Sequence, residues 1–170
     1  MTYNYDKLYG TTPDALGAPT QVFVDFFRGL SATNLRVLDV GCGQGRDAVF
    51  IARLGHTVVG IDCAPNGIRD LNAVAEKEKL KITGVVVDIE NFEPEGMFDV
   101  VLIDRTLHML ATKPRLRALA ALTKLVRRNG YLLIADEAKN ILEFTHLLDT
   151  SSDNWETLRN NRGYLFVRRR

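Results

Sequence analysis

The segment from Leu35 to Asp62, LRVLDVGCGQGRDAVFIARLGHTVVGID, constrains the fold more than any other part of the chain. Residues 37–40 are apolar except for one aspartate, which predicts a strand buried on both faces of a parallel sheet. Three glycines follow at alternate positions, and apolar residues then recur at helical spacing. The segment therefore predicts a strand, a glycine loop, a helix and a second strand at residues 57–61.

The glycine loop predicts a ligand pocket. Gly41, Gly43 and Gly45 let the backbone turn sharply and approach a ligand closely, because a residue without a Cβ has no penalty at positive φ. The loop also delivers its N–H groups to the start of a helix, where an anionic group is favoured. The alternative is a glycine-rich turn that only connects strand to helix.

The acids around the loop discriminate between ligands. The spacing is G-x-G-x-G with Asp39 two residues before the first glycine, whereas a dinucleotide site has G-x-G-x-x-G and a pyrophosphate that this acid would repel. The pattern therefore disfavours NAD. The Asp39 carboxylate suits an ammonium group, and Asp62, at the end of the second strand, suits the hydroxyls of a ribose. Adenosine joined to an amino acid satisfies both.

These motifs resemble those of the class I S-adenosylmethionine-dependent methyltransferases. VLDVGCGQGRD, residues 37–47, is similar to the first motif of that family, and the resemblance extends over about residues 35–136. Within the family, the closest likeness is to the small tellurite-resistance-type methyltransferases. It rests on the Gly-Cys-Gly-x-Gly-Arg loop, the Gly55-His56 turn and the segment IDCAPNGI, residues 61–68.

The resemblance implies S-adenosylmethionine as the cofactor and a site at the carboxyl ends of the strands. Residues 82–87 form a strand that runs into Asp88, which would accept from the adenine amino group, with the Ile89 N–H facing the ring. The alternative for Asp88 is a helix or turn cap. The cofactor-binding residues implied are Tyr9, Asp39, Gly41, Cys42, Gly43, Gly45, Arg46, Asp62, Cys63, Asp88, Ile89 and Asp104.

By the same resemblance, Asp104, Arg105 and His108 lie nearest the reactive methyl and its acceptor. They follow a strand at residues 98–103. The alternatives are an ion pair for Arg105 and a structural place in the short apolar helix LHML for His108. The reaction implied is in-line methyl transfer, which needs positioning more than acid or base groups. A non-catalytic module that binds S-adenosylmethionine or S-adenosylhomocysteine is the second hypothesis, because the firmest motifs bind the cofactor.

The remaining periodicities complete the predicted fold, which is a doubly wound, mostly parallel seven-stranded α/β sheet with helices on both faces and an antiparallel last strand. Helices are expected at residues 18–30, 65–79, 113–126 and 137–148. The fifth strand is expected at 131–135, and a terminal hairpin at 155–158 and 164–167, joined by a turn at 159–163. The C-terminal Arg168-Arg169-Arg170 is expected to be a solvated tail.

The first 12 residues contain Tyr3, Tyr5 and Tyr9 and show no clear helical periodicity. Residues 1–17 form either a lid over the site or a segment packed loosely on the surface.

Cys42 and Cys63 are expected to be small loop fillers, and the alternative of a catalytic thiol would require a cationic neighbour such as Arg46. No Cys/His pair has a metal-ligand spacing, so no metal is predicted.

Composition agrees with one domain over residues 1–170, because 46% hydrophobic content is ample for a single core. A net charge of +1 gives no sign of nucleic-acid binding. Neither an apolar stretch near 18 residues nor a signal peptide is evident, and two cysteines suit a reducing compartment, so we expect a cytoplasmic protein without a membrane partner. Short connections after the fourth and fifth strands predict a small-molecule acceptor, and the oligomeric state is not predicted.

Overall fold

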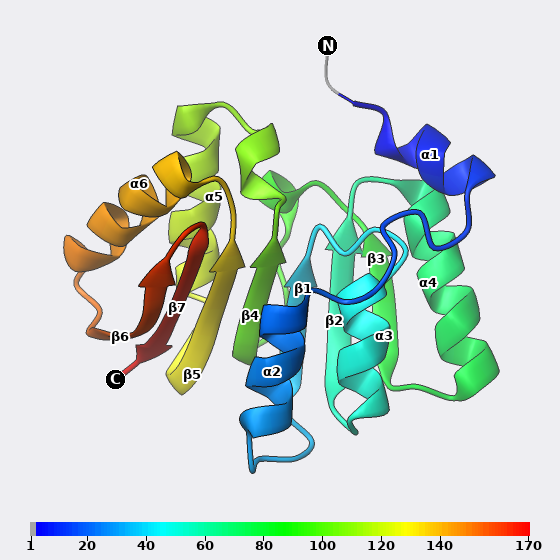
Figure 1. Ribbon diagram of the computed structural model, residues 1–170, viewed down its shortest axis with the longest axis horizontal. Coiled ribbons are helices and arrows are strands. Elements are labelled where there is room, and N and C mark those ends of the chain that lie inside the picture. Colours follow the sequence, from blue (N-terminus) through cyan, green and yellow to red (C-terminus); the bar gives the residue numbers. More distant parts are fainter. Residues whose placement is uncertain (1–2) are drawn as a thin grey trace. The chain divides into compact units, whose positions relative to one another are not determined.

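The computed structural model describes residues 3–170 (Figure 1). These residues divide into two compact units at residue 91. The seven strands are ordered β3-β2-β1-β4-β5-β7-β6 in one mixed sheet, accompanied by six α-helices within the described residues. The predicted seven-stranded, mostly parallel fold class with an antiparallel last strand is confirmed. The prediction of a single domain stays a prediction.

The first unit contains three parallel strands and most of the predicted cofactor site. Its elements are α1 (Tyr5–Thr11), α2 (Gln21–Gly29), β1 (Arg36–Val40), α3 (Arg46–Arg53), β2 (Thr57–Asp62), α4 (Pro65–Glu78), β3 (Ile82–Val86) and the short 3₁₀ helix η1 (Ile89–Asn91). β2 pairs in parallel with β1 and with β3, in a register that places Val40 beside Ile61 and Asp62 beside Val86. The carboxyl ends of these strands therefore lie along one edge.

The second unit combines a parallel pair of strands with an antiparallel hairpin. Its elements are β4 (Phe98–Asp104), the 3₁₀ helix η2 (Leu107–Met109), α5 (Thr112–Thr123), β5 (Val126–Ala135), α6 (Ala138–Asp149), β6 (Trp155–Asn161) and β7 (Tyr164–Arg169). β5 pairs in parallel with β4 and antiparallel with β7. The register sets Asp104 beside Ala135, so β4 and β5 end together.

The structure corrects the N-terminal predictions. Residues 5–11 form the helix α1, in a segment for which no helical periodicity was expected. Asn4 caps this helix, since its Oδ1 accepts the Lys7 N–H at 2.9 Å. The next helix begins at Gln21 rather than at residue 18, with Thr20 as its N-cap, so Pro19 is not in the first turn.

A second correction concerns the fifth strand. α5 ends at Thr123, and Val126 belongs to β5 beside Phe98, although its spacing also suited the predicted helix. Asn129-Gly130, expected to stop that helix, lies inside β5, where the register with β4 shifts. Gly130 fits there because a Cβ would lie 2.8 Å from the Asp99 carbonyl oxygen.

The terminal hairpin is confirmed, with longer strands and a tighter turn than predicted. Only Arg162 and Gly163 separate β6 from β7, and both have positive φ, as two-residue hairpin turns require. The expectation of a solvated arginine tail was wrong, because Arg168 and Arg169 belong to β7 and Arg169 pairs with Asp153 at 2.6 Å.

The hairpin turn yields a stability prediction. Gly163 has φ 90°, and a Cβ there would lie 2.6 Å from the Asp136 carbonyl oxygen. Gly163→Ala should therefore lower the free energy of unfolding by about 1–2 kcal/mol or more, the penalty of a left-handed L-residue plus the displaced backbone. Gly29→Ala, which would meet nothing within 4 Å at the end of α2, is the matched control. Equal urea midpoints for the two variants would contradict the account.

Candidate functional site

The glycine loop between β1 and α3 has the geometry predicted for it. Gly41, Gly43 and Gly45 all have positive φ, at 72°, 53° and 86°, and Gly45 is the N-cap of α3. The N–H groups of Gly41 and Cys42 donate to the Ile61 carbonyl at 2.7 and 3.0 Å. The loop is thus bonded to the end of β2 and leads into a helix N-terminus.

Asp62 connects this loop to the one that follows β2. Its Oδ2 accepts the Gly43 N–H at 2.8 Å, and its Oδ1 accepts the Ala64 N–H at 2.8 Å. The side chain is half-buried, and each carboxylate oxygen has more than one acceptor direction. Asp62 can therefore order both loops and still accept a hydroxyl from a ligand.

The two cysteines lie beside carboxylates rather than beside cations. Burial, followed by Asp39 and Asp62, raises the pKa of the Cys42 thiol well above its usual value. Burial and Asp62, with smaller effects of Asp88 and Asp6, raise the pKa of Cys63. Both thiols are protonated at neutral pH, which argues against a nucleophilic cysteine and favours the role of loop fillers.

Three other predicted residues are either buried or bonded within the protein. Asp39, at the end of β1, is buried. Arg46 at the start of α3 does not serve a thiol, since its Nε donates to Asp47 Oδ2 at 3.2 Å. Asp88 is exposed, and its Oδ1 accepts the Glu90 N–H at 2.8 Å, so it caps the η1 turn that begins at Ile89. The turn-cap alternative for Asp88 is thus present, and a role at adenine stays a prediction.

Tyr9 brings the N-terminal segment onto the glycine loop. Its side chain is 5% exposed and lies so near Gly43 that a Cβ there would be 2.5 Å from the Tyr9 hydroxyl. Gly67 of α4 packs against both residues, because a Cβ added there would lie 2.9 Å from the Gly43 backbone and from the Tyr9 ring. Burial and then the Asp62 carboxylate raise the pKa of the Tyr9 phenol, so it stays neutral and retains a proton to donate.

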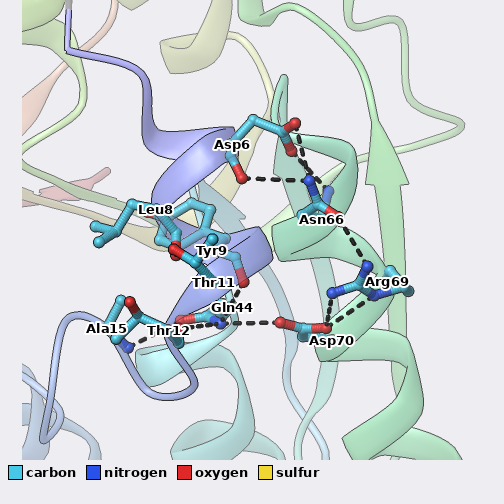
Figure 2. Close-up of polar contacts among 10 residues, drawn as sticks. All are labelled: Asp6, Leu8, Tyr9, Thr11, Thr12, Ala15, Gln44, Asn66, Arg69 and Asp70. Carbon is cyan, nitrogen blue, oxygen red and sulfur yellow. Dashed lines mark hydrogen bonds and ion pairs between the residues drawn. The ribbon is translucent and has the colours of Figure 1, made fainter.

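The α1 helix is held by Asp6, which caps α4. Asp6 Oδ1 accepts the Asn66 N–H at 2.7 Å and Oδ2 accepts Asn66 Nδ2 at 3.0 Å (Figure 2). The N-cap of α4, Ala64, offers no side-chain acceptor, so Asp6 supplies what the helix lacks. Figure 1 shows α1 lying at the start of α4, the end to which Asn66 belongs.

Gln44, inside the glycine loop, holds the chain that follows α1. Its Nε2 donates to Thr12 O at 3.0 Å and to Asp70 Oδ2 at 2.9 Å, with a longer contact to Tyr9 O, and its Oε1 accepts the Ala15 N–H at 2.9 Å (Figure 2). Gln44, Gly67 and the Asp6 cap were not predicted from the sequence, because no local pattern indicates contacts between residues so far apart in the chain. Residues 1 and 2 of the expected lid lie outside the described residues.

The second unit contains the predicted catalytic residues. Asp104, at the end of β4, pairs with the neighbouring Arg105 at 3.1 Å; the Asp104 side chain is 4% exposed and that of Arg105 54%. Arg105 has φ 51°, an uncommon conformation for a residue other than glycine. The ion-pair alternative for Arg105 is therefore present, and its guanidinium remains largely accessible.

His108 lies in η2, the short helix expected for LHML, and its backbone N–H donates to Asp136 Oδ2 at 3.1 Å. Asp136 is buried directly after β5 and was missed, although Asp62 and Asp104 likewise stand at the ends of their strands. Among residues 3–170 no group of three or more His, Cys, Asp or Glu side chains could hold a metal ion. Within the same range, no helix combines the length and hydropathy needed to cross a bilayer.

Comparison with known proteins identifies the family. Residues 37–130 match the model of the methyltransferase domain family. The chain belongs to this family. The resemblance to class I S-adenosylmethionine-dependent methyltransferases is thus confirmed, and with it the cofactor.

Curated relatives include the probable S-adenosyl-L-methionine-dependent methyltransferase TehB of Haemophilus influenzae, 37% identical over 67 residues. That match covers 39% of this chain and 23% of TehB. A ubiquinone biosynthesis O-methyltransferase of Bradyrhizobium diazoefficiens is 32% identical over 111 residues, 65% of this chain and 43% of the relative. The chain thus spans less than half of either protein.

Solved structures of low sequence identity share the fold. The N-methyltransferase NodS of Bradyrhizobium japonicum, in complex with S-adenosyl-L-homocysteine, superimposes with a TM-score of 0.72 at 17% identity, over 99% of this chain and 97% of that one. TehB from Haemophilus influenzae superimposes with a TM-score of 0.71 at 23% identity, over 97% of this chain and 64% of that one.

The position of Asp62 yields a prediction about ribose. Asp62→Ala should weaken S-adenosylhomocysteine binding at least about tenfold, as expected when a hydrogen bond to a charged group is lost. It should also lower the free energy of unfolding, because the Gly43 and Ala64 N–H groups lose their acceptor. Calorimetry measures the first effect and urea unfolding the second, with Asp25→Asn at an exposed position of α2 as the control.

The analogue 2′-deoxy-S-adenosylhomocysteine separates the two roles of Asp62. If Asp62 accepts a ribose hydroxyl, the unaltered protein should bind the analogue more weakly than the parent compound, and Asp62→Ala should bind both alike. An Asp62→Ala variant that still discriminates between them would place the ribose elsewhere.

Proposed function

We propose that this protein transfers the methyl group of S-adenosylmethionine to a small-molecule acceptor. The observation that carries the proposal is the glycine loop tied to Asp62, which combines free acceptor directions, a helix N-terminus and close backbone approach in one place. Family membership supports the same reaction. When bound, S-adenosylmethionine supplies an activated sulfonium methyl group.

The residues of the first unit fit such a cofactor. Asp62 would accept from the ribose hydroxyls, and the Ile89 N–H and Asp88 would face the adenine. The loop from Gly41 to Gly45 would receive the amino-acid part, with the buried Asp39 offsetting its ammonium charge. The carboxylates of Asp62, Asp88 and Asp6, which all act on Cys63, favour a cationic sulfonium over an anionic pyrophosphate.

Tyr9 and α1 would cover the cofactor as a lid. The neutral phenol of Tyr9 can donate a hydrogen bond and, lying on Gly43, excludes water from the loop. Tyr5 continues the aromatic surface, with its ring centroid 5.9 Å from that of Tyr9. This places the protein's own aromatic side chains where the loop would otherwise be solvated.

Arg105 is the residue best suited to an anionic acceptor such as a carboxylate or a chalcogen oxyanion. Its guanidinium has five donors, is largely exposed, and is anchored to Asp104 at one nitrogen only among the contacts described. Asp104 would hold it in place, and His108 would accept a proton where the acceptor must lose one. The methyl carbon bonds to the acceptor atom as its bond to sulfur breaks, so alignment is the main requirement.

The relatives support a small acceptor, since one is named a 2-heptyl-1-hydroxyquinolin-4(1H)-one methyltransferase and others are named ubiquinone biosynthesis O-methyltransferases. The proposal includes no nucleic-acid partner, because a net charge near zero gives the protein no general attraction to a polyanion. A cytoplasmic location is part of the same proposal, which the two cysteines support because they suit a reducing compartment.

An acceptor panel tests the reaction. S-adenosylhomocysteine release is followed with selenite, tellurite, thiols, small amines and carboxylates. We expect turnover with an anionic member, at least about tenfold slower in Arg105→Ala while the calorimetric Kd for S-adenosylhomocysteine changes less than twofold. No release with any acceptor would favour a non-catalytic binding module, and tight NAD binding without a response to S-adenosylhomocysteine would overturn the cofactor assignment.

The lid is tested at the Asp6 cap. Asp6→Ala removes the two side-chain bonds to Asn66, so α1 should open more often and S-adenosylhomocysteine should bind about fivefold more weakly, a loss of about 1 kcal/mol. Lys7→Ala, an exposed change in the same helix, is the control. If hydrogen exchange shows α1 released while the Kd is unchanged, α1 is a surface helix and the lid must be abandoned.

A further inference from the structure

Asp136 is a buried carboxylate at the end of β5 whose two oxygens serve different segments. Oδ1 accepts the Glu137 N–H at 2.7 Å and Asn140 Nδ2 at 2.6 Å, both at the start of α6. Oδ2 accepts the His108 N–H of η2 at 3.1 Å. Within residues 3–170 these three donors bond to the Asp136 carboxylate, and hydrogen bonds to a charged acceptor are among the stronger ones.

Residues 105–108 form an arch over the end of β5 that is closed at both of its ends. At the first end the Arg105 N–H donates to the Ala135 carbonyl at 2.8 Å, and at the second the His108 N–H donates to Asp136. Leu107, within the arch, is fully buried. Two adjacent residues of β5 and its loop, Ala135 and Asp136, therefore fix both ends.

The arch contains strain that its ends must hold. Arg105 adopts φ 51°, and a non-glycine residue keeps such a conformation only where the surrounding structure determines it. If the His108 end is released, the arch can relax and the Arg105 side chain loses its direction. The carboxylate of Asp136 thus maintains this geometry from the side of β5 through its bond to the His108 N–H.

We propose that Asp136 is a positioning residue for methyl transfer, which acts by holding the 105–108 arch and hence the side chains of Arg105 and His108. The inference rests on the proposed function of these two residues toward the acceptor. Asp136 itself contacts neither acceptor nor cofactor in this account. Its loss should therefore affect turnover rather than cofactor affinity.

Asp136→Asn is a selective change, because the two carboxylate oxygens accept hydrogen bonds from different segments. An amide has one acceptor oxygen, and two donors face Oδ1 whereas one faces Oδ2. The amide oxygen should keep the Oδ1 place, which leaves the NH₂ group opposed to the His108 N–H. The variant should release the arch while α6 keeps its start.

Two control variants separate positioning from stability. Asp149→Asn makes the same substitution at the exposed end of α6 and should change nothing. Asn140→Ala removes one donor to Oδ1 and leaves His108 bonded, so it should lower the urea midpoint without lowering kcat. Hydrogen exchange provides the structural readout at the His108 and Glu137 amides.

The kinetics are measured with S-adenosylmethionine and either selenite or tellurite. We expect kcat of Asp136→Asn to fall at least about tenfold, with the Kd for S-adenosylhomocysteine within twofold and exchange faster at His108 but not through α6. A kcat equal to that of Asp149→Asn, or an equal loss in Asn140→Ala, would overturn the inference alone. An unaltered protein that methylates neither anion nor any other acceptor of the panel would overturn the proposed function, and this inference with it.

Discussion

The bond from the Gly43 N–H to Asp62 is the interaction on which the candidate site depends. It fixes the middle of the glycine loop relative to the end of β2. Tyr9 and Gly67 then pack on Gly43 at distances that leave no room for a Cβ. Because these residues are closely packed, a shift of the loop by a fraction of an ångström would disturb all of these contacts.

The same device recurs in the second unit. Asp136 at the end of β5, like Asp62 at the end of β2, accepts N–H groups from two separate segments. Loops that leave a parallel sheet carry backbone donors without strand partners, and a carboxylate at the strand end satisfies several of them. An acid at such a position is therefore not evidence of ligand binding by itself. Asp88, which caps a turn through Oδ1, illustrates the ambiguity.

The sequence predicted what depends on local pattern. The strand, glycine loop and helix of residues 36–53 follow from periodicity and from glycine spacing, and all three elements are present as predicted. The start of β5 was misplaced because Val126 suits a helix by spacing and a strand by residue type, and only pairing with Phe98 decides. α1 was missed because its contacts are with α4, such as the bond from the Asn66 N–H to Asp6, and local periodicity cannot reveal a partner 60 residues away.

Gln44 shows why the role of the N-terminal segment is difficult to read from sequence. Its backbone belongs to the glycine loop, whereas its side chain bonds to Thr12, Ala15 and Asp70. A ligand that orders the loop must therefore also favour one placement of residues 9–15. Because linkage is reciprocal, docking of that segment must favour the ligand by the same free energy. Under the lid hypothesis, lid and loose surface segment are the two ends of one equilibrium, and the Gln44 and Asp6 bonds shift it toward the docked end.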